Sequence, residues 1–349
     1  MEREHILERI SEECGIAALS KAVSQLLDRI HDGAWKDVIT TAEAVRILLL
    51  TGTSRNSETV RRAIKWLREE QDANTGSWND EVWDTAAALR TLRAVGLDLK
   101  SDVVKKGIHA IRSQYDPRSR SWWDVWDSAM AIQCFIDVGL EDDMVRDASK
   151  SILDRRYPPP DCNWLNLHTT ALAIETLSST ELRWENRIIE AKDWLKKEVT
   201  AQKKRMNIWN LALAVRALNC YAKPEEKDFL ETLVRDRIIP AINEGKLDSV
   251  DLCQVSLTLI QTAPTLMKAA TVKAIVDLAE KDQKGLADLF TKIACSWEVG
   301  GLTRELEEKA HEPYVITFGL TKRHLYVIGV IGTIASVVGL ALYLLDLLR

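Results

Sequence analysis

The apolar residues of this chain recur in short alanine-rich segments at a nearly constant interval. In five segments Thr, Ser or Leu is followed by Ala, any residue, a second Ala and an aliphatic residue, and these segments cover residues 41–45, 85–89, 128–132, 170–174 and 211–215. The first alanines of successive segments lie 44, 43, 42 and 41 residues apart, and a weaker sixth copy covers residues 251–256. Such regular spacing indicates a repeated structural unit.

More charged segments lie between the alanine-rich ones and also have a helical pattern. Residues 58–71 place Val60, Ile64 and Leu67 on one helical face, and residues 103–114 repeat this arrangement. No alternation of the kind that strands require persists along the chain. We therefore expect an all-α fold in which each unit is a helical hairpin. The alanine-rich helices, which allow close approach, should form an inner ring, and the charged helices an outer ring in water.

Glycine and proline mark the ends of the predicted helices. Gly52, Gly96 and Gly139 follow the first three alanine-rich helices at the position where a left-handed cap residue is favoured, and residues 158–160 are three consecutive prolines. The pattern predicts a curved double layer of about six hairpins, closed or nearly so. A period in the low forties also fits HEAT or armadillo solenoids, which have repeats of ~40–47 residues.

The tryptophan pattern favours a toroid over those solenoids. Residues 70–78, with Gln71, Gly76 and Trp78, resemble the Gln-Trp motif of squalene-hopene and oxidosqualene cyclases, in which Gln, Gly and Trp tie an outer helix to the next inner one. Residues 82–89 look like the cyclase segment that starts an inner helix and lines the cavity, and residues 122–129 repeat it. The resemblance covers about residues 30–260 and implies the α/α-toroid fold of terpene cyclases and prenyltransferases.

The same resemblance identifies a position for a catalytic acid. In class II cyclases the proton donor is the third residue of an Asp-x-Asp-Asp-Thr-Ala motif, but the matching segment here, residues 124–129, has Trp126 in that place. The parallel copy has Trp83. Asp84 or Asp127 could still donate a proton if burial or a like charge raises its pKa. The alternative is that these aspartates cap their helices or complement the helix dipole.

Two other branches of the toroid family use a metal or a thioester. The prenyltransferase branch holds zinc with Asp, Cys and His, and His168 lies in a segment similar to its His-Thr segment, with Asp127 and Cys220 as the nominal partners. These partners lack the flanking motifs, so no cofactor is predicted and His168 is only a weak metal candidate. The thioester motif Cys-Gly-Glu-Gln is broken in residues 14–17, which excludes that branch.

If the repeats superpose, the starts of the inner helices converge on one end of the central cavity. An aromatic lining with a few polar groups suits an apolar or cationic ligand, and an isoprenoid is the class that the resemblance implies. The alternative is that the tryptophans simply fill the core, which is the better interpretation for Trp66 and Trp194 on outer helices. The candidate ligand-binding residues are Trp83, Asp84, Trp126, Asp127, His168, Trp209 and Asn210.

An uncharged stretch near the C-terminal end is long enough to span a bilayer. Residues Leu325 to Leu345 form a run of 21 without a charge, close to the ~20 that a membrane helix needs. The basic residues 322–324 before it predict that the preceding part is cytoplasmic, in the arrangement of a tail anchor. A buried core helix is the alternative. The predicted organisation is a toroid domain over residues 1–295, a juxtamembrane connector over 296–324 and a membrane helix over 325–345.

Composition and charge exclude some partners. A formal net charge of -5 leaves no basic stripe for phosphates, so nucleic acid is not expected. The six cysteines are scattered, which fits buried thiols in a reducing compartment, and the first residues contain no apolar signal core. Small residues four apart in the membrane segment, Gly332 with Ser336 and Ala335 with Gly339, allow close contact between two such helices, and hence self-association.

Two functional hypotheses follow from these features. The first is a membrane-tethered, non-catalytic toroid that binds an apolar ligand, a partner protein or a second copy of itself and acts as a sensor or effector. The second is an enzyme acting on isoprenoid lipids, in which Asp84, Asp127 and His168 would be the working groups.

Overall fold

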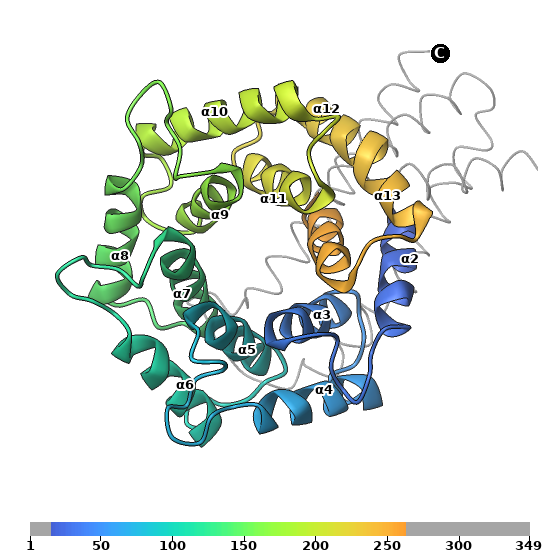
Figure 1. Cartoon of the computed structure of the whole chain (residues 1–349), viewed down its shortest axis with the longest axis vertical. Coiled ribbons are helices and arrows are strands. Elements are labelled where there is room, and N and C mark those ends of the chain that lie inside the picture. The colour runs from blue at the N-terminus through green and yellow to red at the C-terminus, as the bar shows by residue number, and fades with distance from the viewer. Residues whose placement is uncertain (1–14, 263–349) are drawn as a thin grey trace, which may run out of the picture. The chain divides into compact units, whose positions relative to one another are not determined.

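The computed structural model describes residues 15–262, and these form two concentric rings of helices (Figure 1). Within this range there is no β-strand, only isolated bridges in three loops. The inner ring consists of α3 (Val38–Leu50), α5 (Val82–Ala94), α7 (Val125–Val138), α9 (Leu167–Leu177), α11 (Ile208–Asn219) and a helix that begins at residue 249 and continues to 262.

Each inner helix is preceded by an outer one, so the described range holds six helical hairpins. The last outer element is continuous, because α12 passes through a π-helical segment into α13. The predicted α/α toroid is confirmed. The outer ring consists of α2 (Ile16–Leu27), α4 (Glu58–Glu69), α6 (Asp102–Ser113), α8 (Asp143–Asp154), α10 (Asn186–Gln202), α12 (Pro224–Leu233), η1 (Val234–Ile238) and α13 (Ile239–Glu244).

The ring is closed by contacts between its first and last helices. In the outer ring, Lys21 Nζ of α2 donates a hydrogen bond to the Asn243 carbonyl of α13 at 3.0 Å. In the inner ring, Gln254 Nε2 donates to Glu43 Oε2 of α3 at 2.7 Å. These bonds join residues more than 200 positions apart, so the repeats form a closed toroid and not an open solenoid.

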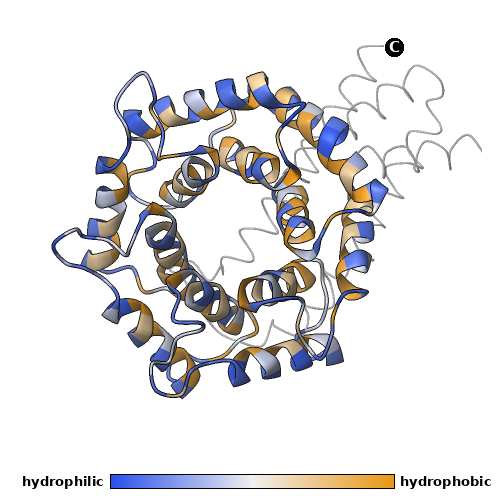
Figure 2. Ribbon diagram, in the orientation of Figure 1, coloured by the Kyte–Doolittle hydropathy of each residue, from blue (hydrophilic) through white to orange (hydrophobic). Residues whose placement is uncertain are grey.

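Hydrophobic burial explains why the two rings differ in composition. The inner helices are buried on several sides, and Figure 2 shows them as largely apolar. Alanines such as Ala42, Ala86 and Ala129 are completely buried, which lets neighbouring inner helices pack closely. The outer helices bury only one face, for example Val60 and Leu67 in α4, and present charged residues outward.

Four buried tryptophans fasten the outer helix to the inner helix of a hairpin. The indole N–H of each donates to a backbone carbonyl of the preceding outer helix at 2.5–2.7 Å, and the backbone N–H donates to a Thr or Ser hydroxyl of the following inner helix at 2.9–3.1 Å. The fifth hairpin has no tryptophan at this place, where Arg205 stands, and has Leu211 instead of the hydroxyl residue, so it lacks both bonds. The four tryptophans are Trp35, Trp78, Trp122 and Trp164.

The glutamine of the Gln-Trp motif makes a different connection from the one that the resemblance implies. Gln71 Nε2 donates to the Gly76 carbonyl at 2.8 Å and to the Val103 carbonyl of α6 at 2.9 Å. It therefore links two outer helices, while Trp78 makes the link to the inner helix. Gly76 has φ +75°, and a Cβ there would lie 2.7 Å from the Lys106 carbonyl oxygen, so this close approach requires glycine.

Other local predictions agree with the structure. Gly52, Gly96 and Gly139 all have positive φ just after inner helices, and the three prolines lie in the loop between α8 and α9. Trp66 and Trp194 are partly buried against the core. The four cysteines in the described range are free thiols.

No helix within residues 15–262 is long and apolar enough to cross a membrane. The stretch at 325–345 and the connector at 296–324 lie outside the described residues, so those parts of the domain assignment stay predictions.

Candidate binding site at the N-terminal mouth of the inner ring

The hairpin repeat places the N-terminal ends of the inner helices on the same side of the ring, and capping residues mark where each helix begins. At five of the six starts, the side chain of an Asp or Asn accepts a hydrogen bond from the backbone N–H three residues later, at 2.8–2.9 Å. The residues that follow these caps surround one opening of the toroid, which we call the N-terminal mouth. The capping residues are Asp37, Asp124, Asn166, Asn207 and Asp248.

Three aromatic side chains from different helices meet at this mouth. The ring of His168 on α9 lies 5.8 Å from Trp126 on α7 and 5.4 Å from Trp209 on α11, measured between centroids. The two indoles are 5.9 Å apart. All three are only partly buried, so each presents aromatic surface to solvent. The structure thus brings together three of the residues that the repeat alignment predicts to converge.

Trp83 occupies the same repeat position on α5 but lies outside this cluster. Its side chain is partly buried against the hydrophobic core. It makes no ring contact with Trp126 or with another aromatic ring in residues 15–262. Trp83 therefore shares the repeat position of Trp126 and Trp209 but does not belong to their aromatic cluster.

The two candidate acids lie in the first turns of α5 and α7. Burial, with smaller contributions from the negative charges of Asp124 and Glu81, raises the pKa of Asp127 to about 6. Burial also raises the pKa of Asp84, which is 5% exposed and accepts a hydrogen bond from Asn79 Nδ2 at 2.7 Å. Neither aspartate is the N-cap of its helix, because Asp124 is the N-cap of α7 and Glu81 is the N-cap residue of α5.

The remaining candidates add polar groups with unused hydrogen-bonding capacity. Burial lowers the pKa of His168, which favours the neutral form of its ring. The side-chain carbonyl oxygen of Asn210 is buried and has no hydrogen-bond donor among the described residues. A ligand that reaches this oxygen would satisfy it.

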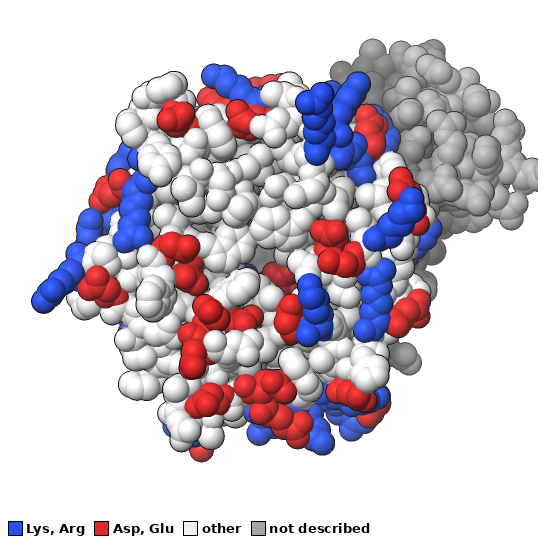
Figure 3. All heavy atoms as spheres, in the orientation of Figure 1, with Lys and Arg blue, Asp and Glu red and all other residues white. Residues whose placement is uncertain are grey.

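Charge is distributed unevenly around the mouth. Figure 3 shows acidic side chains around the opening over α3, α5 and α7, and a largely uncharged area over α9 and α11. The aromatic cluster belongs to α7, α9 and α11, so it lies where the acidic part borders the uncharged part.

Deeper in the lumen, polar side chains from all six inner helices form a hydrogen-bonded belt. Arg216 Nη2 lies 3.1 Å from Glu175 Oε2, and Arg216 Nη1 donates to Gln254 Oε1 at 2.6 Å. Gln254 in turn donates to Glu43. These bonds connect α9, α11, the last inner helix and α3.

The other half of the belt joins α5, α7 and α9. Arg90 donates to Asp137 Oδ2 at 2.6 Å and to Gln133 Oε1 at 2.9 Å. Gln133 donates to Thr176 Oγ1 at 2.8 Å. The sequence analysis missed this belt, although its signal was present, because a polar residue stands four positions after each of the first five repeat alanines: Arg46, Arg90, Gln133, Glu175 and Arg216.

The three nominal zinc ligands do not come together. Asp127 and His168 lie at the starts of α7 and α9, whereas Cys220 is the C-cap of α11, at the opposite end of a 12-residue helix about 18 Å long. Among the residues that the structure describes, no three His, Cys, Asp or Glu side chains form a metal-binding group. The weak assignment of His168 to a zinc site is therefore wrong for this set of partners.

Comparison with known proteins supports the fold. No protein-family profile matches the sequence, and no curated protein matches it significantly. Among solved structures, a variant of the type II terpene cyclase MstE from Scytonema, in complex with its substrate geranylgeranyl dihydroxybenzoate, superposes with a TM-score of 0.60 at 15% identity. That match covers 74% of this chain and 99% of the other.

The apo form of MstE gives a TM-score of 0.59 at 16% identity, with 73% of this chain and 99% of the other covered. At these identities the likeness concerns the fold alone. The described part of the chain therefore has the α/α-toroid fold of the type II terpene cyclases.

Proposed function

We propose that this chain is a binding domain that uses the N-terminal mouth to hold the cationic group of an amphiphilic ligand or of a partner protein. The observation that carries the proposal is the cluster of Trp126, His168 and Trp209 at the border of an acidic opening. Aromatic faces attract cations by about 0.5–2 kcal/mol each, depending on desolvation. Because burial favours the neutral form of His168, its ring does not repel such a group.

The electrostatic balance at the mouth also favours a cation. Six helix N-termini contribute roughly half a positive charge each, about +3 in total. Among the side chains near these N-termini, carboxylates outnumber basic groups by five. The net charge of the mouth is therefore negative. Within three residues of the six helix starts the acids are Asp37, Asp80, Glu81, Asp84, Asp124, Asp127, Asp248 and Asp251, and the bases are Lys36, Arg205 and Lys246.

Two features weigh against a cyclase reaction. The position of the proton donor is occupied by Trp126, whose indole cannot supply a proton to an alkene. A polyprenyl chain in the lumen would also lie against the belt of Arg90, Glu175 and Arg216. Apolar groups that displace hydrogen bonds of buried charges incur a large desolvation cost.

Calorimetry with a simple organic cation tests the proposal. Tetrapropylammonium is titrated into the full chain in neutral-lipid nanodiscs, with empty nanodiscs as the blank. We expect saturable binding that weakens at least tenfold in Trp126→Ala and in Trp209→Ala. Trp184→Ala is the matched control, because Trp184 is 73% exposed in the loop between α9 and α10. Equal binding by all four proteins, or no binding by any, would contradict the proposal.

A second candidate, an isoprenoid-lipid enzyme, is favoured by one observation. The pKa of Asp127 is raised to about 6, mainly by burial, and its helix also carries one of the clustered indoles. A carboxyl with that pKa can act as a general acid near neutral pH. The substrate named for MstE, geranylgeranyl dihydroxybenzoate, is a reasonable first compound to test.

Product analysis distinguishes the two candidates. The purified chain is incubated with geranylgeranyl dihydroxybenzoate and, separately, with squalene, and products are identified by mass spectrometry. A cyclised product that disappears in Asp127→Asn would establish the enzyme and overturn the binding proposal. Our proposal predicts that both substrates are recovered unchanged.

A membrane tether formed by residues 325–345, with the toroid in the cytoplasm, is part of the same proposal. It is supported by the length and lack of charge of that stretch and by the basic residues before it. We expect the full chain to sediment with membranes after carbonate washing and a truncation after residue 324 to remain in the supernatant. Cross-linking of the full chain, compared with Gly332→Leu, tests the predicted self-association.

A further inference from the structure

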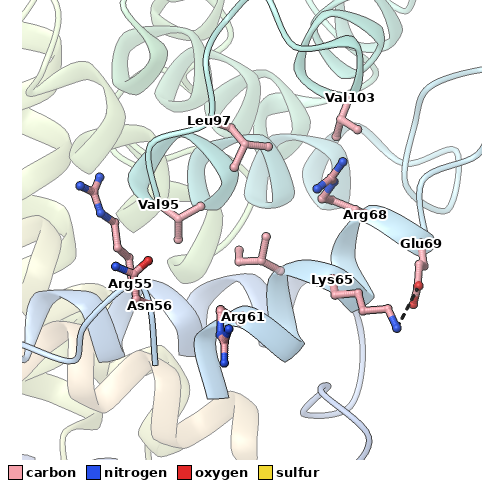
Figure 4. Close-up of a pocket in the computed structure, with 10 residues that line it drawn as sticks. Arg55, Asn56, Arg61, Lys65, Arg68, Glu69, Val95, Leu97 and Val103 are labelled. Carbon is pink, nitrogen blue, oxygen red and sulfur yellow. Dashed lines mark ion pairs between the residues drawn. The ribbon is translucent and has the colours of Figure 1, made fainter. Parts of the chain in front are cut away.

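A cavity lies outside the inner ring, and its lining includes none of the residues of the mouth. It has a volume of about 710 Å³ and is bounded on one side by α4 and the residues just before it, and on the other by residues 95–103, which follow α5 and include the start of α6 (Figure 4). This volume falls within the range of about 300–1,000 Å³ typical of small-molecule sites. Nothing in the proposed function uses this cavity.

One wall of the cavity is apolar. Val95 and Leu97 project toward α4 in Figure 4, and Ile64 of α4 and Val103 complete the lining. All four side chains are only partly buried, so they expose hydrocarbon surface to the cavity. Covering such surface with an aliphatic chain is favourable by roughly 25 cal/mol per Å² of apolar area removed from water.

Two guanidinium groups stand at separate ends of this apolar wall. Figure 4 shows Arg55 at one end and Arg68 at the other, and neither forms an ion pair with any residue of the described range 15–262. The two other basic residues of the lining are already matched, since Arg61 pairs with Glu58 at 2.6 Å and Lys65 with Glu69 at 3.7 Å. The charge available to a ligand is thus carried by Arg55 and Arg68.

One of these groups lies close to the end of α5. Gly96 has φ +97°, and an added Cβ there would lie 3.0 Å from Arg55 Nη1. The guanidinium therefore rests against the glycine at the end of α5, next to Val95 and Leu97. A guanidinium with hydrocarbon beside it can bind an oxyanion whose chain lies along the apolar wall.

We propose that this cavity binds a single-chain amphiphilic anion, with a phosphate or carboxylate head on Arg55 or Arg68 and an aliphatic chain against Ile64, Val95, Leu97 and Val103. The proposal is independent of the mouth, and the two can fail separately. It specifies the chemistry of the ligand through two properties that can be varied one at a time, the charge of the head and the length of the chain.

The test uses octyl phosphate as the probe, titrated calorimetrically into the full chain in neutral-lipid nanodiscs with empty nanodiscs as the blank. We expect the double variant Arg55→Glu/Arg68→Glu to weaken binding at least tenfold. The control Arg118→Glu/Lys150→Glu has the same change in net charge at exposed positions outside the cavity and should change binding less than twofold.

Chain length is tested on the unmodified protein. Butyl phosphate has the same head with four fewer methylenes, and we expect it to bind at least tenfold more weakly, because each buried methylene adds to affinity. Equal binding of octyl phosphate by the cavity variant, the control and the unmodified chain would overturn the proposal. Equal binding of butyl and octyl phosphate by the unmodified chain would overturn it as well. Both tests are independent of whether the chain or its variants bind tetrapropylammonium.

Discussion

At the scale of single residues, the tryptophans divide into two functional groups that composition alone does not separate. Trp35, Trp78, Trp122 and Trp164 are buried and donate their indole N–H to an outer helix. Trp126 and Trp209 are partly exposed and face each other at the mouth. The distinction depends on the position relative to the repeat alanine, since the fastening tryptophans precede it by seven or eight residues and the mouth residues by three.

The adjacent residues Trp122 and Trp123 provide a direct comparison. Trp122→Phe removes the hydrogen bond to the Ile111 carbonyl and leaves a small void, so we expect it to lower the free energy of unfolding by about 2–3 kcal/mol. Trp123→Phe should change it by less than about 0.5 kcal/mol, because Trp123 is 81% exposed. Urea denaturation followed by circular dichroism measures both. Equal effects would contradict the fastening role.

The raised pKa of Asp127 predicts a pH-dependent stability. Its pKa is about 6 in the folded chain and near 3.8 in the unfolded chain, so the folded state binds the proton more tightly. The destabilisation of the folded state by the negative charge of Asp127 is therefore absent at low pH. It develops as pH rises from about 4 to 6 and is complete above the folded pKa.

We expect Asp127→Asn to raise the free energy of unfolding by about 1 kcal/mol at pH 7.5, after allowance for solvent screening and lost helix-dipole interaction. The gain should be only about a third as large at pH 4.5, where the charge penalty has begun to develop but is not complete. Urea melts at the two pH values check this, and a gain that is larger at pH 4.5 would show that the sign is wrong.

At the scale of elements, periodicity located the helices well. The outer helix expected over 58–71 is α4 at Glu58–Glu69, and the one expected over 103–114 is α6 at Asp102–Ser113. The sequence could not show which loop positions come close in space. Gly76 was recognised as part of the Gln-Trp motif, but the motif did not show that its backbone packs directly on Lys106 of the next outer helix.

Gly76 and Gly52 form a matched pair for testing that contact. Both have positive φ, but a Cβ at Gly52 would meet nothing within 4 Å, whereas one at Gly76 would lie 2.7 Å from the Lys106 carbonyl oxygen. We expect Gly52→Ala to cost about 1 kcal/mol for backbone strain alone. Gly76→Ala should cost at least about 2 kcal/mol more. Thermal unfolding of the two variants measures the difference, and similar melting temperatures would contradict the close packing.

At the scale of the whole molecule, the repeats predicted a double layer of helices that is closed or nearly so, and the tryptophan pattern favoured a toroid over a solenoid. Closure is confirmed by bonds such as Gln254 to Glu43. The polar belt was not predicted, because each of its residues looks like an isolated polar position on an apolar helix. Only ring closure brings residues from six separate helices into one network. The mouth was predicted in part, since the alignment placed Trp126, His168 and Trp209 together but also included Trp83, whose ring contacts none of them.

The belt is expected to be sensitive to removal of one charge. Arg216→Met leaves Glu175 and Gln254 without their guanidinium partner in a buried site, and we expect a loss of about 3–5 kcal/mol. Arg61→Met, which breaks an exposed pair with Glu58, should cost under about 1 kcal/mol. The double variant Arg216→Met/Glu175→Met should recover much of the loss. Chemical denaturation of the three variants checks this, and no recovery in the double variant would contradict a charge-based cause.

The central claim is that the clustered aromatic rings at the mouth contact a cation. Fluorine NMR of the full chain labelled with 5-fluorotryptophan, with resonances assigned by substitution, measures this contact directly during titration with tetrapropylammonium. The account predicts saturable shifts of the Trp126 and Trp209 resonances while those of Trp123 and Trp184 stay in place. Unchanged resonances at Trp126 and Trp209, or equal shifts at all four, would contradict it.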